Sequence, residues 1–209
     1  MNFADPLHDH IGMVCLLKNS GNDIDIVNAA RISYNKHSEE MADFETKLIQ
    51  KLFKLGHRSP FEHSFLHFHI KCPIFVARQW MRHRIGVSYN ELSLRRTKSE
   101  LEFYIPLNII NDSEKAIPYK TAINSMRACY IRLLQTGVKT EDARFVLPLC
   151  TYTEFFFSCN LASFFHFLDL RDHPDAQWEI RRYAEEMKKI VAEYYPISVW
   201  CYDNHKQCF

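Results

Sequence analysis

The sequence predicts an α+β fold, mostly helical with a small antiparallel sheet. Apolar residues recur at helical spacing over long stretches, strand-like alternation is confined to short segments, and these segments are grouped early in the chain. The chain has 209 residues, 47% of them hydrophobic and 14% aromatic, which is enough for one hydrophobic core. A single domain over residues 1–209 is therefore expected.

Strands and helices are predicted to alternate in the first half of the chain. Residues 64–70 form a strand because Leu66, Phe68 and Ile70 alternate with residues of the opposite face. The elements expected here are a strand over 12–20, a helix over 24–34 with Asp23 as its N-cap, a helix over 42–55 stopped by Gly56, a loop over 57–63, and the strand over 64–70.

The second half is predicted to be helical apart from one polar stretch and one short strand. The expected elements are a helix from 74 to about 84, an irregular stretch over 85–99, a strand over 102–105, and helices over 120–135, 141–160, 163–170 and 175–195, the last with Pro174 in its first turn. In the helix from residue 74, Ile74, Ala77 and Met81 would form the buried stripe.

Composition excludes several classes of protein. The net charge of +1 provides no general attraction for nucleic acid. The chain shows no apolar run of membrane-spanning length and no secretion signal, so a soluble, cytoplasmic protein without a membrane partner is expected. Seven cysteines without a Cys-x-x-Cys pair indicate reduced thiols. Glycine-rich nucleotide motifs are absent, so arginines would have to hold the phosphates of any nucleotide.

The stretch from Arg82 to Arg96 concentrates four arginines with one histidine and two serines. Arginine presents a rigid fork of donors that suits phosphate oxygens and planar polarised groups. An anion site is one interpretation. A solvated basic helix end, favoured by the helix dipole, explains the same residues equally well.

Two further stretches carry candidate site residues. If Asn160 caps a helix, Arg171 ends a very apolar segment and needs a partner, because an unpaired buried charge is costly. A bound ligand would serve, and so would a salt bridge to Asp172 or Asp175. Residues 57–63 form either a plain turn or a site wall in which Glu62 and His63 are hydrogen-bonded.

The motif Arg82-His83-Arg84, followed after a polar spacer by Ser93, resembles the signature of flavin-dependent thymidylate synthases. Other segments resemble the same family in the same order: 57–63 with the following strand, 77–80, 90–93, 102–106, 143–149 and 168–180. The resemblance covers nearly the whole chain and implies the fold of that family.

The resemblance also implies the reaction. A family member methylates dUMP to dTMP, with 5,10-methylenetetrahydrofolate as the carbon donor and FADH2, reduced by NADPH, as the hydride source. It works as a homotetramer whose active sites are shared between subunits. No cysteine of this chain falls in a matched site motif, so no cysteine nucleophile is expected, and Cys159 is the nearest candidate.

Site residues follow from the same match. Arg171 takes the position that stabilises negative charge around N3 and O4 of uracil, which makes C5 nucleophilic. The residues implied to contact FAD are Ser33, Ser59, Glu62, Arg82, His83, Arg84, Ile85, Glu91, Asn160 and His166. The residues implied to line the dUMP site are Gln79, Arg82, Glu91, Leu92, Ser93, Leu94, Arg95, Arg144 and Arg171.

The sequence departs from the family pattern in the length of one spacer and at three single positions. Arg96 stands where an aromatic residue often follows Arg95. The spacer from Arg84 to Ser93 holds eight residues, one more than usual, and the extra residue is expected to bulge around Gly86. Ala162 and His166 stand where the family often has an arginine and an asparagine. The lost arginine predicts weaker FAD binding, because a charge-assisted hydrogen bond contributes roughly 1.5–3 kcal/mol.

Three other functions compete with this one. A catalytically impaired relative would bind nucleotide or flavin only. A metal protein would use His63, His67 and His69, although no zinc-ligand spacing is present. A nucleic-acid or nucleotide binder would use the basic patch over residues 82–98, which the near-neutral net charge disfavours.

Overall fold

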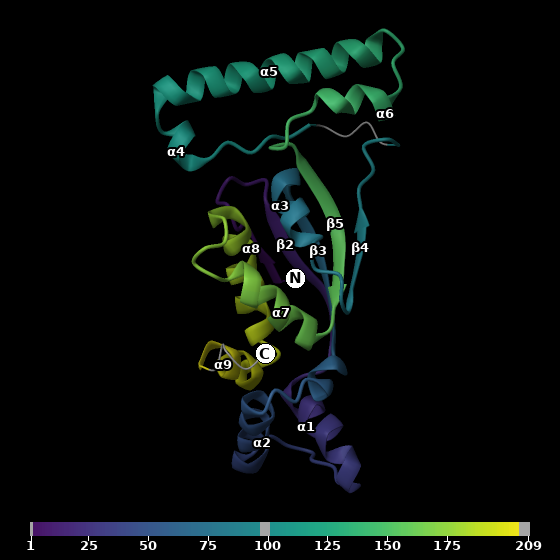
Figure 1. Ribbon diagram of the computed structural model, residues 1–209, viewed down its shortest axis with the longest axis vertical. Helices are drawn as coiled ribbons and strands as arrows, with labels where there is room; N and C mark the ends of the chain where they lie inside the picture. The colour runs from purple at the N-terminus through teal and green to yellow at the C-terminus, as the bar shows by residue number, and fades with distance from the viewer. Residues whose placement is uncertain (1, 97–100, 205–209) are drawn as a thin grey trace.

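A five-stranded antiparallel sheet forms the middle of the molecule (Figure 1). The computed structural model describes residues 2–96 and 101–204. The strands are β1 (Asn2–Ala4), β2 (Met13–Ser20), β3 (Phe65–Pro73), β4 (Val87–Glu91) and β5 (Tyr152–Cys159), in the spatial order β1-β2-β3-β5-β4. The last strand of the chain thus lies inside the sheet, between β3 and β4.

Helices cover one face of the sheet and extend beyond both of its ends. They are α1 (Asp23–Arg31), α2 (Asp43–Lys54), α3 (Ile74–Trp80), α4 (Leu107–Ile110), α5 (Ser113–Gln135), α6 (Thr140–Ala143), α7 (Leu161–Arg171), α8 (Trp178–Ala192) and α9 (Pro196–Asn204). Figure 1 shows α3, α7 and α8 against the sheet, α1 and α2 at one end of the molecule, and α5 at the other. The chain is therefore elongated.

Aromatic side chains fill the layer between sheet and helices. The Trp80 ring lies 4.9 Å from that of Phe167 and 5.4 Å from that of Phe155, and all three side chains are fully or almost fully buried. Burying each such ring contributes roughly 2–3 kcal/mol. This layer fixes α3 and α7 against β5.

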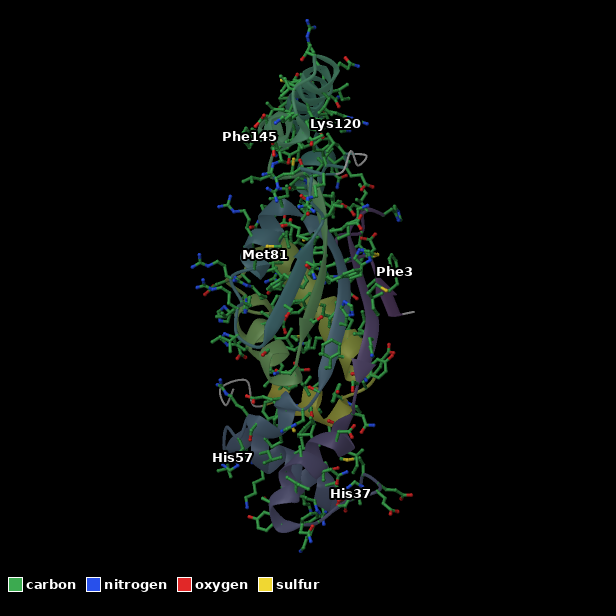
Figure 2. All side chains as sticks on the ribbon, turned by 90° about the vertical axis from the view of Figure 1, so that its right-hand side faces the viewer. Phe3, His37, His57, Met81, Lys120 and Phe145 are labelled. Carbon is green, nitrogen blue, oxygen red and sulfur yellow. The ribbon has the colours of Figure 1, made fainter. Side chains whose placement is uncertain are left out.

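The opposite face of the sheet is open. On β3, Leu66, Phe68 and Ile70 are fully buried as predicted, whereas His67 and His69 on the other face remain partly exposed. Figure 2 shows Met81, after α3, and Phe3, on β1, on opposite sides of the molecule. Only the helical face of the sheet therefore belongs to the core.

The predicted early elements are confirmed, with one correction at the start of α1. The strand over 12–20, the helix over 42–55 and the strand over 64–70 correspond to β2, α2 and β3. Asn22, not Asp23, caps α1: its side chain accepts a hydrogen bond from the backbone of Ile24, and the Asp25 carboxylate accepts one from the backbone of Asn22. This reciprocal capping box uses the residue three positions after the cap.

The helix predicted over 141–160 is wrong, since most of that range is a 3₁₀ turn and strand β5. Its threonines and consecutive phenylalanines favour a strand, but a short apolar run does not distinguish a strand from a buried helix by spacing alone. The stretch predicted to be irregular over 85–99 contains β4, an edge strand with polar side chains. Residues 97–99 of that stretch lie outside the described part of the chain.

Several boundaries also differ from the predictions. Helix α3 ends at Trp80, and its buried residues are Val76, Ala77 and Trp80 instead of the predicted stripe with Ile74 and Met81. The strand predicted over 102–105 is a single bridge from Phe103 to Thr151. Helix α5 begins at Ser113, with Asp112 as its cap, instead of at residue 120. Helix α8 begins at Trp178 instead of residue 175, so Pro174 lies before its first turn.

The helix predicted over 163–170 is confirmed as α7, which begins at Leu161. The six cysteines among the described residues are free thiols, and Cys208 lies outside that part of the chain. None of the helices between residues 2 and 204, outside the gap at 97–100, is long and apolar enough to cross a membrane.

Asp23 connects the two ends of the chain. Its side chain is only 4% exposed and accepts hydrogen bonds from the backbone amides of Ile197 and Ser198, at 2.8 and 3.1 Å, and from the Ser198 hydroxyl at 2.6 Å. The carboxylate thus satisfies amides in the first turn of α9.

Replacing Asp23 with alanine leaves these buried donors without an acceptor. We expect Asp23→Ala to lower the free energy of unfolding by about 2–4 kcal/mol. The exposed Asp25 accepts one hydrogen bond at the start of α1, so Asp25→Ala should cost only about 0.5–1 kcal/mol. Urea denaturation measures both, and equal losses would contradict this role for Asp23.

Candidate active site

The Arg171 guanidinium is held by two neutral acceptors. It ends α7, and its Nε donates to His83 Nε2 at 3.0 Å while its terminal nitrogen donates to the Gln79 carbonyl at 2.8 Å. Asp172, one of the two partners proposed from the sequence, instead forms an ion pair with Lys188. Arg171 therefore keeps its full positive charge, since neither acceptor is anionic.

His83 is neutral at pH 7. The residue is only 5% exposed. Burial, together with the nearby Arg171 and His166, lowers the pKa of His83 to about 4. Because Nε2 accepts the hydrogen bond from Arg171, the ring proton is on Nδ1. The histidine orients the arginine without adding a second charge.

Tyr89 fixes the turn that carries His83. Its hydroxyl, on β4, donates to the carbonyls of Trp80 and His83 at 3.1 and 3.0 Å. Burial raises the pKa of Tyr89, which keeps the phenol a donor. The turn after α3 is thus held from β4 and from α7, and it presents Arg82 and Arg84 to solvent.

The loop between this turn and β4 packs tightly against the start of α7. Gly86 has a φ of 66°, and a Cβ at that position would lie 2.2 Å from the Ser163 hydroxyl oxygen. Asn160, which the sequence offered as a possible cap, does cap α7, and its side chain accepts a hydrogen bond from the backbone amide of Ser163 at 2.8 Å. The positive φ and the close approach to Ser163 require glycine at this position, whereas neighbouring Ile85 is 83% exposed.

A second group of predicted residues follows β4. The Thr153 hydroxyl donates to Glu91 Oε1 at 2.7 Å, and the Leu92 amide donates to the Glu154 carbonyl at 2.8 Å. Ser93 and Leu94 are half-buried, and the carbonyl of the exposed Arg95 accepts the Thr140 hydroxyl. A cavity of 260 Å³ adjoins this group and is lined by His69, Asn90, Glu91, Leu92, Glu154, Phe155 and Phe156.

A third group lies at the end of the molecule formed by α1 and α2. Ser33 and Ser59 line a cavity of 560 Å³ together with Lys51 and His57. The nearby Glu62 is exposed, and it forms no hydrogen bond with His63 among the described residues. The lining of this cavity therefore combines two hydroxyl groups and the Lys51 ammonium with apolar side chains such as Leu48 and Leu52.

The structure therefore distributes the predicted residues over the length of the molecule. It brings together Gln79, Arg82, His83, Arg84, Ile85, Asn160, His166 and Arg171 around the turn after α3. Figure 2 shows His57, beside the Ser59 cavity, near one end and Phe145, next to Arg144, near the other. Within the described residues, the Arg144 side chain donates a hydrogen bond to its own segment, at the Glu141 carbonyl.

Sequence reasoning missed Tyr89 and Thr153 as parts of this site. Tyr89 acts from β4 and Thr153 acts from β5, and neither strand was predicted. The alternation of Val87, Tyr89 and Glu91 with polar residues was the signal available for β4.

The histidines proposed as metal ligands do not form such a site. His67 and His69 flank the Phe156 ring at 5.2 Å each, and His69 contacts Glu154 at 3.1 Å. In the described part of the chain, no three His, Cys, Asp or Glu side chains are grouped to hold a metal ion.

Comparisons with known proteins agree with this geometry. The family model described as thymidylate synthase complementing protein matches residues 15–197. The chain is 43% identical over 198 residues to the flavin-dependent thymidylate synthase of Thermotoga neapolitana, covering 92% of this chain and 89% of that protein. This chain belongs to the flavin-dependent thymidylate synthase family. The enzyme of that name from Thermus thermophilus is 41% identical over 208 residues, covering 93% of this chain and 76% of that protein.

A solved structure extends the similarity to the fold. A UMP/dUMP methylase, PolB from Streptomyces cacaoi, solved with 5-Br dUMP, has a TM-score of 0.84 at 31% identity and covers 91% of this chain and 94% of its own. The predicted α+β class and family fold are therefore confirmed. As a member of the flavin-dependent thymidylate synthase family, the chain is an enzyme of dUMP methylation.

Substituting Gly86 tests the close approach of this loop to the start of α7. Gly86→Ala places a Cβ against Ser163 and a side chain at positive φ, so we expect the free energy of unfolding to fall by about 2–4 kcal/mol and FAD affinity to fall with it. Urea denaturation and flavin fluorescence titration measure the two effects.

Gly137→Ala is the matched control. Gly137 also has a positive φ, of 87°, but a Cβ there would meet nothing within 4 Å, so only about 1–2 kcal/mol of backbone strain is expected and no change in FAD affinity. Equal effects of the two substitutions would show that the approach to Ser163 is unimportant.

The lowered pKa of His83 predicts that the folded protein becomes less stable as the pH falls. Unfolded histidine titrates near pH 6.5, whereas burial lowers the pKa of His83 to about 4 in the folded protein. Between these values the unfolded chain binds a proton that the folded chain does not, so stability is lost as the pH falls from 6.5 to 4, by up to about 3 kcal/mol.

The variant His83→Gln, which does not titrate, should lose less stability over this pH range. Urea denaturation at pH 7 and pH 4.5 gives the loss for each protein. If wild type and variant lose the same free energy, the neutral state assigned to His83 is wrong.

Proposed function

We propose that residues 1–209 form one catalytic domain that converts dUMP to dTMP, with 5,10-methylenetetrahydrofolate as the carbon donor. FAD is the proposed cofactor, which supplies hydride once NADPH has reduced it. The similarity to PolB, which was solved with 5-Br dUMP, supports a uridine nucleotide as the substrate. The observation that carries the proposal is the Arg171 guanidinium, held by neutral His83 and the Gln79 carbonyl.

The groups present fit FAD. Exposed Arg82 and Arg84 flank buried His83, and cations suit both a diphosphate and a reduced, anionic flavin ring. The residues proposed to hold FAD are Ser33, Ser59, Glu62, Arg82, His83, Arg84, Ile85, Glu91, Asn160 and His166. Side-chain donors would thus replace the glycine-rich loop that many nucleotide sites use.

Arg171 is the proposed catalytic residue. A fixed guanidinium next to O4 and N3 of uracil stabilises negative charge on the ring, which makes C5 nucleophilic. Because its acceptors are neutral, they orient the arginine without neutralising its charge. The residues proposed to bind dUMP are Gln79, Arg82, Glu91, Leu92, Ser93, Leu94, Arg95, Arg144 and Arg171.

No cysteine nucleophile is proposed. Burial raises the pKa of the Cys72, Cys150 and Cys159 thiols, and it raises that of Cys201 to about 12. A protonated thiol is a poor nucleophile. Cys159, the nearest candidate in the sequence, lies in the core at the end of β5.

A homotetramer with shared active sites is also proposed. The predicted residues near α1, near Arg171 and near Arg144 are spread along one elongated chain, so several copies would be needed to surround one nucleotide and one FAD. Large apolar side chains are exposed around α5: Ile117 at 67%, Ile131 at 43% and Phe145 at 75%. Such surfaces are typical of contacts between subunits.

The direct test is dTMP formation from dUMP without oxygen, with excess FAD, NADPH and methylenetetrahydrofolate. We expect product from the wild type and a fall in kcat of about 100-fold or more for Arg171→Ala, because a transition-state charge partner is lost. The control is Arg182→Ala, which removes surface ion pairs to Glu185 and Glu186.

The outcomes separate the alternatives. A folded, FAD-bound wild type that makes no dTMP would favour the catalytically impaired relative. Product from Arg171→Ala at the wild-type rate would refute the role of Arg171 alone.

A further inference from the structure

The Glu91 carboxylate is oriented from the neighbouring strand. Thr153, on β5, is 3% exposed, and its hydroxyl donates to Glu91 Oε1 at 2.7 Å. Glu91 is the last residue of β4 and is exposed to solvent. Among the described residues, no other side chain donates a hydrogen bond to this carboxylate.

The register of the sheet explains this contact. Glu91 pairs with Phe155, so Thr153, two residues away on the same face of β5, is its diagonal neighbour. The Leu92 amide bonds the Glu154 carbonyl at 2.8 Å and extends the ladder one residue beyond β4. The backbone and the side chain of Glu91 are therefore both fixed by β5.

The direction of the hydrogen bond follows from the surroundings of Thr153. A buried hydroxyl needs a partner, and an ionised carboxylate accepts but does not donate. On β3, Cys72 pairs with Thr153, and burial, with a contribution from Glu91, raises the pKa of its thiol. The neutral Cys72 thiol is a weaker acceptor than the Glu91 carboxylate. The Thr153 hydroxyl therefore donates its proton to Glu91 in a charge-assisted hydrogen bond.

We propose that Thr153 is a positioning residue for the nucleotide site, whose hydroxyl holds the Glu91 carboxylate in the orientation that accepts a hydrogen bond from dUMP. This inference rests on the proposed function, in which Glu91 lines the dUMP site. An exposed glutamate samples several rotamers, and holding it in one of them lowers the entropic cost of binding.

The substitution Thr153→Val keeps the shape of the side chain and removes only the hydroxyl. With FAD saturating, we expect KM and Kd for dUMP to rise about five- to tenfold, because a hydrogen bond to a charged group is lost, with kcat within about threefold of wild type. Thr153→Ser, which keeps the hydroxyl, should restore both constants to within about twofold. A serine variant as weak as the valine variant would overturn the proposal.

A double-mutant cycle distinguishes positioning from packing. If the hydroxyl acts through Glu91, then Thr153→Val combined with Glu91→Ala should bind dUMP no more weakly than Glu91→Ala alone. Additive losses would overturn the proposal. Thr151→Val is the control for a buried hydroxyl next to β5, since Thr151 is fully buried and its hydroxyl donates to the Pro148 carbonyl at 2.7 Å. It should leave dUMP binding unchanged.

Failure of this inference and failure of the proposed function give different results. A wild type that neither binds dUMP nor forms dTMP refutes the proposed function. A wild type that does both, with unchanged dUMP constants in Thr153→Val, refutes only the role of Thr153. If Thr153→Val does not fold, Thr153→Ala, which also removes the hydroxyl, replaces it with the same expected rise.

Discussion

The hydrogen bond from Arg171 to neutral His83 is the interaction on which the rest of the site depends. A guanidinium at the end of an apolar helix must find acceptors, and both of its acceptors, the His83 ring and the Gln79 carbonyl, belong to α3 and the turn that follows it. The same pairing therefore sets the position of α7 relative to α3. It also leaves Arg82 and Arg84 free to face solvent.

This pairing is maintained by the aromatic layer beneath it. Trp80 stacks on Phe167, and Phe157 stacks on Tyr89 with ring centroids 5.3 Å apart, so α3, α7, β4 and β5 converge on one rigid core. The Tyr89 hydroxyl, on β4, also holds the turn after α3 through hydrogen bonds to the Trp80 and His83 carbonyls. Close-packed rings tolerate little displacement, which keeps the orientation of Arg171 well defined.

The sequence predicted those parts of the molecule whose signals are local. Alternation predicted β3, apolar spacing predicted the body of α7, and the apolar context of Arg171 indicated that it needs a partner, whereas its proposed role came from the resemblance to the family. It did not predict β5, because Phe155–Phe157 is apolar at successive positions and its pairing with β3 depends on residues more than 80 positions earlier. The roles of Tyr89 and Thr153 were missed for the same reason, since cross-strand contacts leave no trace in local spacing.

Two of the departures from the family pattern, the longer spacer and Ala162, meet at the start of α7. Gly86 packs against Ser163, and the adjacent Ala162 is only 8% exposed. An arginine at that position would need an anionic partner or a path to solvent, because a buried cation without either is costly. Alanine removes that requirement. In the proposed flavin site, the exposed Arg82 and Arg84 would then have to meet the phosphates without that arginine, which makes the turn held by His83 and Tyr89 more important to the proposal.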